Sequence, residues 1–219
     1  MTKKEVIDVI IDLYEQARYI NLPNGMENNK IRRGRSRIVA GQAEELFAHF
    51  VSLNIPAAEK ILVDQPISYR PIDKAKTIYP DIMPIVNKKI NIIIDLKMDL
   101  GMKRDQIFNI YSAASTLLDE IRGKEIWYKD GVTKEAQTAH ISEKATYIIV
   151  VISRLNINKN DLDNQINTLN SLDIQDKVKL YFLTDKAHPN WQDSKSAKEA
   201  IVLLPDFDKF IEDLQKQIL

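Results

Sequence analysis

The sequence predicts an α/β fold, with a central mixed β-sheet flanked by helices. Two observations lead to this prediction. Apolar residues recur at helical spacing in five segments, and compact runs rich in Ile, Val, Tyr and Phe are typical of buried strands. The order along the chain is two helices, a three-strand meander, a helix, and then alternating strands and helices. A chain of 219 residues with this order is expected to form one domain, residues 1–219, around a substantial core.

Five segments are expected to be helical. The first is an N-terminal helix attached to the core, covering about residues 3–20. It ends at NLPNGMENN, which is dense in Asn, Pro and Gly. The second runs from Ser36, whose hydroxyl suits an N-cap, to Leu53. The remaining three cover about residues 103–122, 158–172 and 206–219.

The expected meander covers residues 60–99. KILVDQPISY is a candidate strand that is interrupted by Pro66, because proline cannot donate a hydrogen bond to a neighbouring strand. TIYPDIMPIV and KINIIIDLKMD follow as two further strands, joined by a short polar turn around Asn87, Lys88 and Lys89.

Two buried strands are expected in the C-terminal half, at ATYIIVVIS and KVKLYFLT. The segment before them, residues 123–144, is polar and is predicted to be irregular, with a turn at its Asp-Gly pair. Trp127, Tyr128 and Lys129 in this segment either contact a nucleic acid or belong to a packed hairpin.

Composition excludes several kinds of protein and site. The chain has no cysteine, so disulfides and thiolate metal sites are excluded, and a reducing, cytoplasmic location is expected. The N-terminus carries acids within an amphipathic pattern, unlike a signal peptide. No apolar run approaches about 18 residues, so no membrane partner is expected. The 31 basic residues balance 31 acidic ones, so net charge does not indicate a nucleic-acid partner.

Basic residues are nonetheless concentrated in one arm, about residues 28–37. The chain has no acid between Asn28 and Ala43, but it has five basic residues there: Lys30, Arg32, Arg33, Arg35 and Arg37. A solvated loop is one interpretation, because charge runs usually lie on the surface. The other is a DNA-binding arm formed by the four arginines, because arginine binds phosphate bidentately and Gly34 lets the backbone approach a ligand.

The charged residues of the meander are unusual for strand-like sequence. Side chains alternate across a strand, so Ile93, Asp95 and Lys97 share one face while the opposite face is apolar. If the two strands pair through the turn at Asn87, opposed residue numbers sum to about 176, which places Asp81 across from Asp95. Two carboxylates this close repel each other. Because Mg²⁺ is typically held by one or two carboxylates plus water, the pair predicts a Mg²⁺ site.

This arrangement resembles the PD-(D/E)xK nuclease superfamily, which includes many type II restriction endonucleases and DNA repair nucleases. The resemblance rests on Pro80-Asp81, thirteen intervening residues, and Asp95-Leu96-Lys97 after an apolar run, and it covers about residues 36–185. It implies a restriction-endonuclease-like core. In that core Asp81, Asp95 and the Leu96 carbonyl bind Mg²⁺, and Lys97 orients or activates the attacking water.

The resemblance also implies a further acid from the helix before the meander. Glu44 is chosen over Glu45 as this metal ligand because it lies nearer the margin of the apolar helix face. Mn²⁺ is expected to substitute for Mg²⁺, whereas Ca²⁺ is expected to support binding without cleavage. The number of metals, the choice of helix acid, the recognition sequence and the cut position stay open.

Together these features predict a Mg²⁺-dependent deoxyribonuclease that hydrolyses phosphodiester bonds in double-stranded DNA, most like a type II restriction endonuclease. A homodimer matched to a palindrome is expected, because one active site cuts one strand. Two alternatives stay open: a repair or junction-resolving nuclease of the same fold, and a non-catalytic DNA-binding module. Gln106 and Tyr111 are five apart. The exonuclease branch often carries Q-x-x-x-Y, with a spacing of four, so assignment to that branch is weakened.

Overall fold

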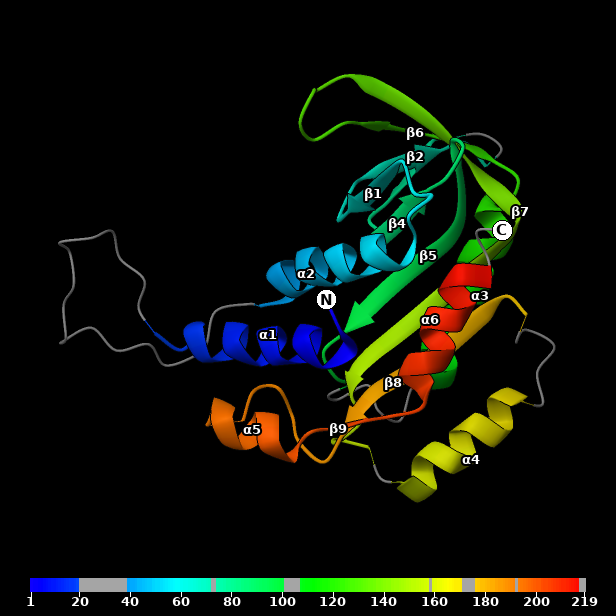
Figure 1. Cartoon of the computed structure of the whole chain (residues 1–219). Coiled ribbons are helices and arrows are strands. Elements are labelled where there is room, and N and C mark those ends of the chain that lie inside the picture. Colours follow the sequence, from blue (N-terminus) through cyan, green and yellow to red (C-terminus); the bar gives the residue numbers. More distant parts are fainter. Residues whose placement is uncertain are drawn as a thin grey trace, which may run out of the picture.

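A computed structural model describes residues 1–19, 39–71, 74–100, 107–157, 159–170, 176–191 and 193–216 of the chain. This part of the chain forms an α/β structure in which one mixed sheet of nine strands is flanked by helices on both faces (Figure 1). The predicted α/β class, with helices flanking a mixed sheet, is therefore confirmed. No helix among the described residues is both long and apolar enough to cross a membrane.

The middle of the sheet is parallel and includes β5, which carries Asp95, and two antiparallel strands extend the sheet beyond β5. β5 (Lys89–Lys97) lies parallel to β7 (Ala136–Ser153), which lies parallel to β8 (Val178–Asp185). β4 (Ile82–Ile85) and then β1 (Lys60–Val63) follow antiparallel on the other side of β5. The central strands are rich in buried Ile and Val because helices cover both of their faces.

β7 is long enough to take part in two regions of the sheet. Its first half pairs with β6 (Glu125–Lys129), which continues to β2 (Ile67–Tyr69) and β3 (Lys76–Ile78). Its second half pairs with β8, beside which lies the short β9 (Val202–Leu203). The candidate strand at residues 60–69 is therefore two strands, β1 and β2, in different parts of the sheet.

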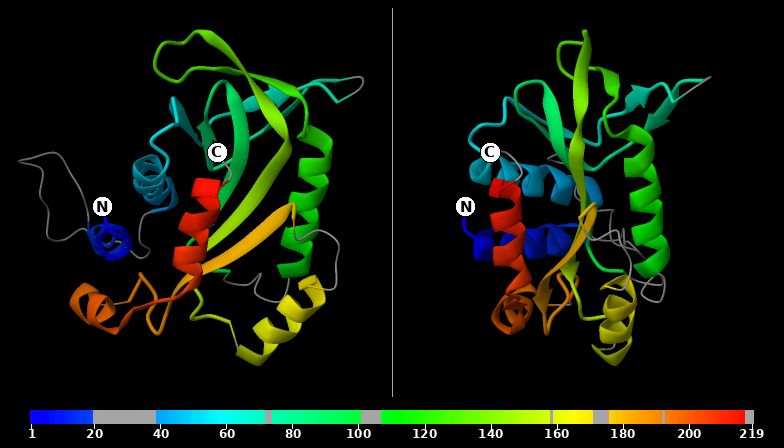
Figure 2. Two further views of the ribbon diagram at one scale, coloured as in Figure 1. Left: turned by 45° about the vertical axis from the view of Figure 1, so that its right-hand side comes forward. Right: turned by 90° about the vertical axis from the view of Figure 1, so that its right-hand side faces the viewer.

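The described helices divide between the two faces of the sheet (Figure 2). One face is covered by α1 (Lys3–Gln16), α2 (Ala40–Asn54), α5 (Ser194–Ala200) and α6 (Asp206–Lys216). The other face is covered by α3 (Ile107–Ile121) and α4 (Lys159–Asn170). Each face has its own apolar core, so the sheet is anchored on both sides.

The core that supports α2 is aromatic. Phe47 of α2 stacks on Phe210 of α6 with ring centroids 5.6 Å apart, and Phe50 meets Phe207 edge-on at 5.5 Å. All four side chains are essentially buried. Such pairs contribute about 0.5–1.5 kcal/mol each beyond burial of their area. They fix α2 against the sheet, which matters because α2 carries Glu44.

Two helix boundaries differ from the prediction. The first helix ends at Gln16 rather than near residue 20, because the N–H groups of Arg18 and Tyr19 bond to carbonyls three residues back and tighten the chain out of the α-helix. The second begins at Ala40 rather than Ser36. Val39 occupies its N-cap position without a side-chain hydrogen bond, so Ser36 is not the cap.

Residues 123–144 are regular rather than irregular. β6 and the first half of β7 form an antiparallel hairpin in which Trp127 pairs with Thr138, so the hairpin is confirmed, while the Trp127 ring stays partly exposed on it. The predicted turn lies at its tip, where Asp130 Oδ1 accepts hydrogen bonds from the backbone of Val132 at 2.9 Å and Thr133 at 3.0 Å. The predicted strand at residues 77–86 is two strands, β3 and β4, and the short elements α5 and β9 are additions that the sequence pattern did not indicate.

The hairpin of β4 and β5 has the predicted register. Ile82 pairs with Ile94, and these numbers sum to 176. Its turn contains Asn87 at φ 51° and Lys88 at φ 58°, the two positive φ angles that a tight type I′ hairpin turn requires. The two predicted acids therefore occupy opposed positions just beyond the last paired residues.

Candidate active site

Three neighbouring strands carry an aspartate at the same end of the sheet. The registers of β1 with β4 and of β4 with β5 continue to Asp64, Asp81 and Asp95 as neighbours. The Asp64 N–H donates to the Asp81 carbonyl oxygen at 2.9 Å, which extends the pairing of β1 and β4 by one residue. Asp64 has φ 43°, a left-handed conformation that aspartate tolerates better than most residues.

Asp81 lies in an environment that disfavours its charge. Its Oδ2 accepts a hydrogen bond from the Leu96 N–H at 2.7 Å, which holds the carboxyl across the hairpin. Burial, the hydrogen bond to the Asp95 carboxylate and the negative charge of Asp95 raise the pKa of Asp81 to about 7. The Leu96 N–H and Lys97 act in the opposite direction but do not cancel these effects. In the absence of a cation, a large fraction of Asp81 therefore stays protonated near neutral pH, because a second negative charge beside Asp95 is disfavoured.

Lys97 belongs to the same group of charges. Its Nζ forms an ion pair with Asp95 Oδ1. The Asp95 side chain is 15% exposed and that of Lys97 is 40% exposed, so the amine lies on the solvent side of the pair. The sequence prediction that these three residues lie together is confirmed, whereas their chemical roles remain predictions.

Glu44 lies in the same electrostatic neighbourhood. It is half-buried on α2, whereas Glu45 is exposed. Burial and the charge of Asp64 raise the pKa of Glu44, the charge of Asp95 adds to this, and the charge of Lys97 opposes it. The charges of the strand-end acids and of Lys97 therefore act on Glu44, whose role as a metal ligand stays a prediction.

Two residues near the acids were not predicted from the sequence. Asp64 lies within the candidate strand KILVDQPISY, but spacing alone does not fix the register in which the first part of that strand pairs with β4. Tyr147 of β7 pairs with Ile93 and lies beside the acids. Burial and the charges of Asp95 and Asp81 raise its pKa. Its hydroxyl therefore stays protonated. A half-buried tyrosine after an alanine-threonine pair gives no recognisable signal in the sequence.

The next acid in the chain, two residues beyond the end of β5, has other partners. Asp99 Oδ2 lies 2.6 Å from His188 Nε2 and accepts a hydrogen bond from Asn156 Nδ2 at 3.0 Å. His188 Nδ1 in turn accepts the Asn190 N–H at 3.0 Å. These bonds connect the end of β5 to the loops after β7 and β8, so Asp99 has a structural explanation that Asp81 lacks.

The donor set fits Mg²⁺ with a shell completed by water. Among the described residues, no three acidic or histidine side chains converge closely enough to enclose a metal ion by themselves. Asp81 and Asp95 nevertheless supply two oxygen ligands whose mutual repulsion a cation would relieve, and Mg²⁺ usually keeps several waters beside one or two carboxylates. The residues that would hold it are Asp81, Asp95 and the carbonyl of Leu96.

The other sequence candidates have structural explanations or lie elsewhere. Asp193, which also fits the D-x-K pattern with Lys195, is the N-cap of α5, where it accepts hydrogen bonds from Lys195 N at 3.1 Å and Ser196 N at 3.2 Å. The buried Tyr111 donates its hydroxyl to the Val178 carbonyl. The basic arm, with Arg32, Arg33, Arg35 and Arg37, lies outside the described residues, as does Gln106.

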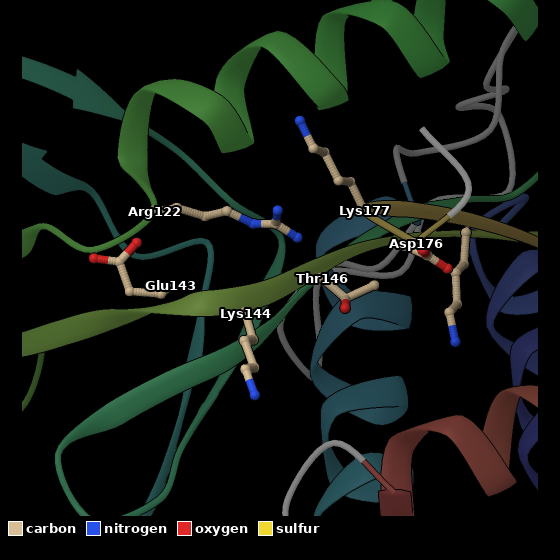
Figure 3. Close-up of a pocket in the computed structure, with 7 residues that line it drawn as sticks. Arg122, Glu143, Lys144, Thr146, Asp176 and Lys177 are labelled. Carbon is tan, nitrogen blue, oxygen red and sulfur yellow. The ribbon is translucent and has the colours of Figure 1, made fainter. Parts of the chain in front are cut away.

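A basic pocket of about 560 Å³ lies at the opposite end of the parallel strands (Figure 3). Its charged lining residues are Arg122, Glu143, Lys144, Asp176, Lys177 and Lys179. Several of its cations are already engaged. Lys177 pairs with Asp119 at 2.6 Å, Lys179 pairs with Asp213 at 2.7 Å, and Arg122 Nε donates to the Ala145 carbonyl at 2.8 Å. This pocket is therefore a weaker candidate than the strand-end acids.

Comparison of the chain with protein-family models, with curated proteins and with solved structures finds no match. The functional assignment consequently rests on the geometry of the acids at the ends of β1, β4 and β5.

Proposed function

We propose that this chain is a Mg²⁺-dependent DNA endonuclease with a restriction-endonuclease-like core, most similar in action to a type II restriction enzyme. One observation carries the proposal. Asp81 and Asp95 meet across a hairpin, with Lys97 bonded to Asp95 and the pKa of Asp81 raised to about 7. A folded core gains nothing from two opposed carboxylates unless a ligand uses them.

Each residue has a role that follows from its contacts. The Leu96 N–H orients Asp81, and the ion pair with Lys97 orients Asp95, so both carboxylates are fixed before substrate arrives. The partly exposed Lys97 amine has protons left to hold a water molecule beside the scissile phosphate and to offset its growing negative charge. Glu44 and Asp64 add negative charge at the rim, which favours a cation.

Bound Mg²⁺ would supply Lewis-acid activation of the phosphate and of the attacking water. The protonated hydroxyl of Tyr147, beside the two acids, can donate a hydrogen bond to whichever carboxylate carries the charge. We further propose that two copies of the chain act as a homodimer on double-stranded DNA, because each chain supplies one set of acids and a duplex has two strands.

Digestion of unmethylated plasmid and genomic DNA tests this proposal. Purified protein with Mg²⁺ is expected to produce discrete fragments, and EDTA is expected to stop the reaction. Cutting confined to junctions or damaged sites would instead assign the protein to the repair nucleases of this fold. Binding of DNA with no cutting in Mg²⁺ or Mn²⁺ would leave the non-catalytic module and overturn the proposal.

A further inference from the structure

A second surface suited to nucleic acid lies on β6, away from the acids. Ile126 and Tyr128 of this strand point inward and are buried, while Trp127 points outward with 38% of its surface exposed. Trp127 pairs with Ser68 of β2 and Thr138 of β7, so strands hold it on both sides. A large indole on a rigid sheet face is a platform on which a flat ring can stack.

An open hollow of about 560 Å³ adjoins this indole. Its lining residues are Arg70, Lys124, Glu125 and Trp127, which combine one aromatic ring, two cations and one acid. Lys124 Nζ lies 5.9 Å from the centre of the Tyr69 ring, a contact that positions the amine at the hollow. Arg70 is exposed and forms no ion pair with any residue in the described ranges. Arg70 is therefore less engaged than Lys177 and Lys179 of the basic pocket in Figure 3, whereas Lys124 also interacts with the charge of Glu120.

We propose that this hollow binds an unpaired nucleotide of a single-stranded DNA segment. A base would stack on Trp127, Arg70 and Lys124 would contact the flanking phosphates, and Glu125 would accept a hydrogen bond from a base amino group. Aromatic rings beside cations form the usual surface for single strands, because every base has a face that can stack. A paired duplex does not present such a face, since its bases already stack on each other.

The hollow and the acids are far enough apart to contact different parts of one substrate. His140 of β7 lies between Glu125 of β6 and Lys89 of β5, so β6 is level with the start of β5. Asp95 follows Lys89 by six residues of the same strand, a rise of about 20 Å at 3.3 Å per residue. At the spacing of about 3.4 Å per nucleotide along one strand of a duplex, that corresponds to about six nucleotides. The choice of DNA as the ligand rests on the proposed nuclease function.

The fluorescence of Trp127 gives a direct test. The chain has two tryptophans, so Trp191→Phe leaves Trp127 as the single reporter. In EDTA, which prevents cleavage, this protein is titrated with a twelve-residue oligothymidylate and separately with a blunt duplex. Stacking is expected to quench the fluorescence with the single strand and much less with the duplex.

Variants separate stacking from charge. By filter binding of labelled single strand, Trp127→Ala is expected to weaken affinity about 5- to 150-fold, the range that one stacked base contributes, and Trp127→Phe to recover part of it. Arg70→Ala is expected to lower the slope of log K against log salt by about 0.7, the value for one phosphate contact on a single strand. Val132→Ala, at an exposed residue of the hairpin tip, is the matched control and should bind normally.

The outcomes also distinguish this inference from the nuclease proposal. If the wild-type protein cuts DNA but Trp127 shows no quenching, or if duplex quenches it as strongly as single strand, the hollow is not a site for an unpaired base. If Trp127 is quenched as expected while no DNA is cut under any condition, the nuclease proposal fails and the binding surface stands.

Discussion

Both ends of the parallel strands carry many charged side chains, but the charges are paired at one end and left partly unpaired at the other. At the basic pocket, Lys177 and Lys179 each contact an aspartate outside the pocket, and Arg122 bonds to a backbone carbonyl (Figure 3). At the acidic end, Lys97 forms an ion pair with Asp95. The charge of Asp95 still disfavours a charge on Asp81. Neutralised charge is typical of a surface that holds the fold together. Charge left in repulsion indicates a place that a ligand completes.

The pKa directions express the same contrast. At the pocket end, burial acts to raise the pKa of Asp213, but hydrogen bonds from Lys179 and Tyr181 outweigh it and lower the pKa. At the acidic end, burial and Asp95 raise the pKa of Asp81 to about 7. The first carboxylate stabilises the folded chain by being charged, and the second costs stability when it is charged.

The largest expected effect on cleavage comes from replacing Lys97, and it tests whether the charges at the acidic end serve a ligand. Lys97→Ala is expected to bind DNA nearly normally in Ca²⁺ but to lose about 10²- to 10⁴-fold in single-turnover cleavage, because in the proposed mechanism the amine acts on a charge that develops in the transition state. Lys97→Arg should be nearly as inactive, since a broad planar fork cannot replace a compact ammonium. Near-normal cleavage by the arginine variant would show that positive charge alone suffices.

A smaller effect on cleavage is expected from the two adjacent glutamates of α2. Glu44→Gln is expected to reduce cleavage about 10- to 100-fold, the usual cost of altering a group that supports a metal site. Glu45→Gln is the matched control, because Glu45 is exposed on the same turn of the helix and should retain wild-type activity. Equal activity of the two variants, measured at limiting Mg²⁺, would remove Glu44 from the site.

The smallest expected effect is a change in thermal stability with pH, measured in EDTA. Asp81 has a folded pKa of about 7 and an unfolded pKa near 3.9. The folded chain therefore binds this proton more tightly, and stability should fall as pH rises from about 4 to about 7. Asp213 has a lowered folded pKa, so its contribution is present above its unfolded pKa and is lost as pH falls through the lowered value.

Two variants test which residue causes each part of the dependence of thermal stability on pH. Asp81→Asn should flatten the part of the stability profile above about pH 4, and Asp213→Asn should flatten the part below it. The expected shifts are a few degrees in melting temperature, since about 1 kcal/mol corresponds to roughly 2–4 °C at this chain length. Addition of Mg²⁺ at pH 8 should raise the melting temperature of the wild type but not that of Asp81→Asn. A wild-type profile that rises between pH 4 and 7 would contradict the repulsion between the two acids.

The hairpin was predictable because two independent constraints agree on it. The apolar alternation of β5 fixes which side chains share a face, and the turn at Asn87 and Lys88 fixes the register, so Asp81 and Asp95 could be paired from sequence. Asp64 could not be predicted, because its place depends on β1 pairing with β4 across an excursion through β2 and β3. Local spacing carries no information about such a non-local pairing.

Other differences have equally specific causes. The β6–β7 hairpin was hidden because residues such as Trp127 and Lys129 face solvent, which makes the segment polar on average despite a strict alternation. The start of α2 was misplaced because Ser36 is a favourable cap, whereas the helix begins after Val39 without one. α5 is short and polar, so periodicity could not distinguish it from a loop.

The central claim is that Asp81 and Asp95 form a Mg²⁺-dependent DNA-cleaving site. It is tested most directly by single-turnover cleavage of supercoiled plasmid with enzyme in excess and saturating Mg²⁺, comparing wild type, Asp81→Asn, Asp95→Asn and Lys179→Gln. The wild type and the Lys179 variant, altered in the basic pocket, are expected to cut. Both aspartate variants are expected to stay folded, bind DNA in Ca²⁺ and cut at least about 10²–10³-fold more slowly. Cleavage by either aspartate variant within about tenfold of wild type, or no cleavage by the wild type itself, would contradict the account.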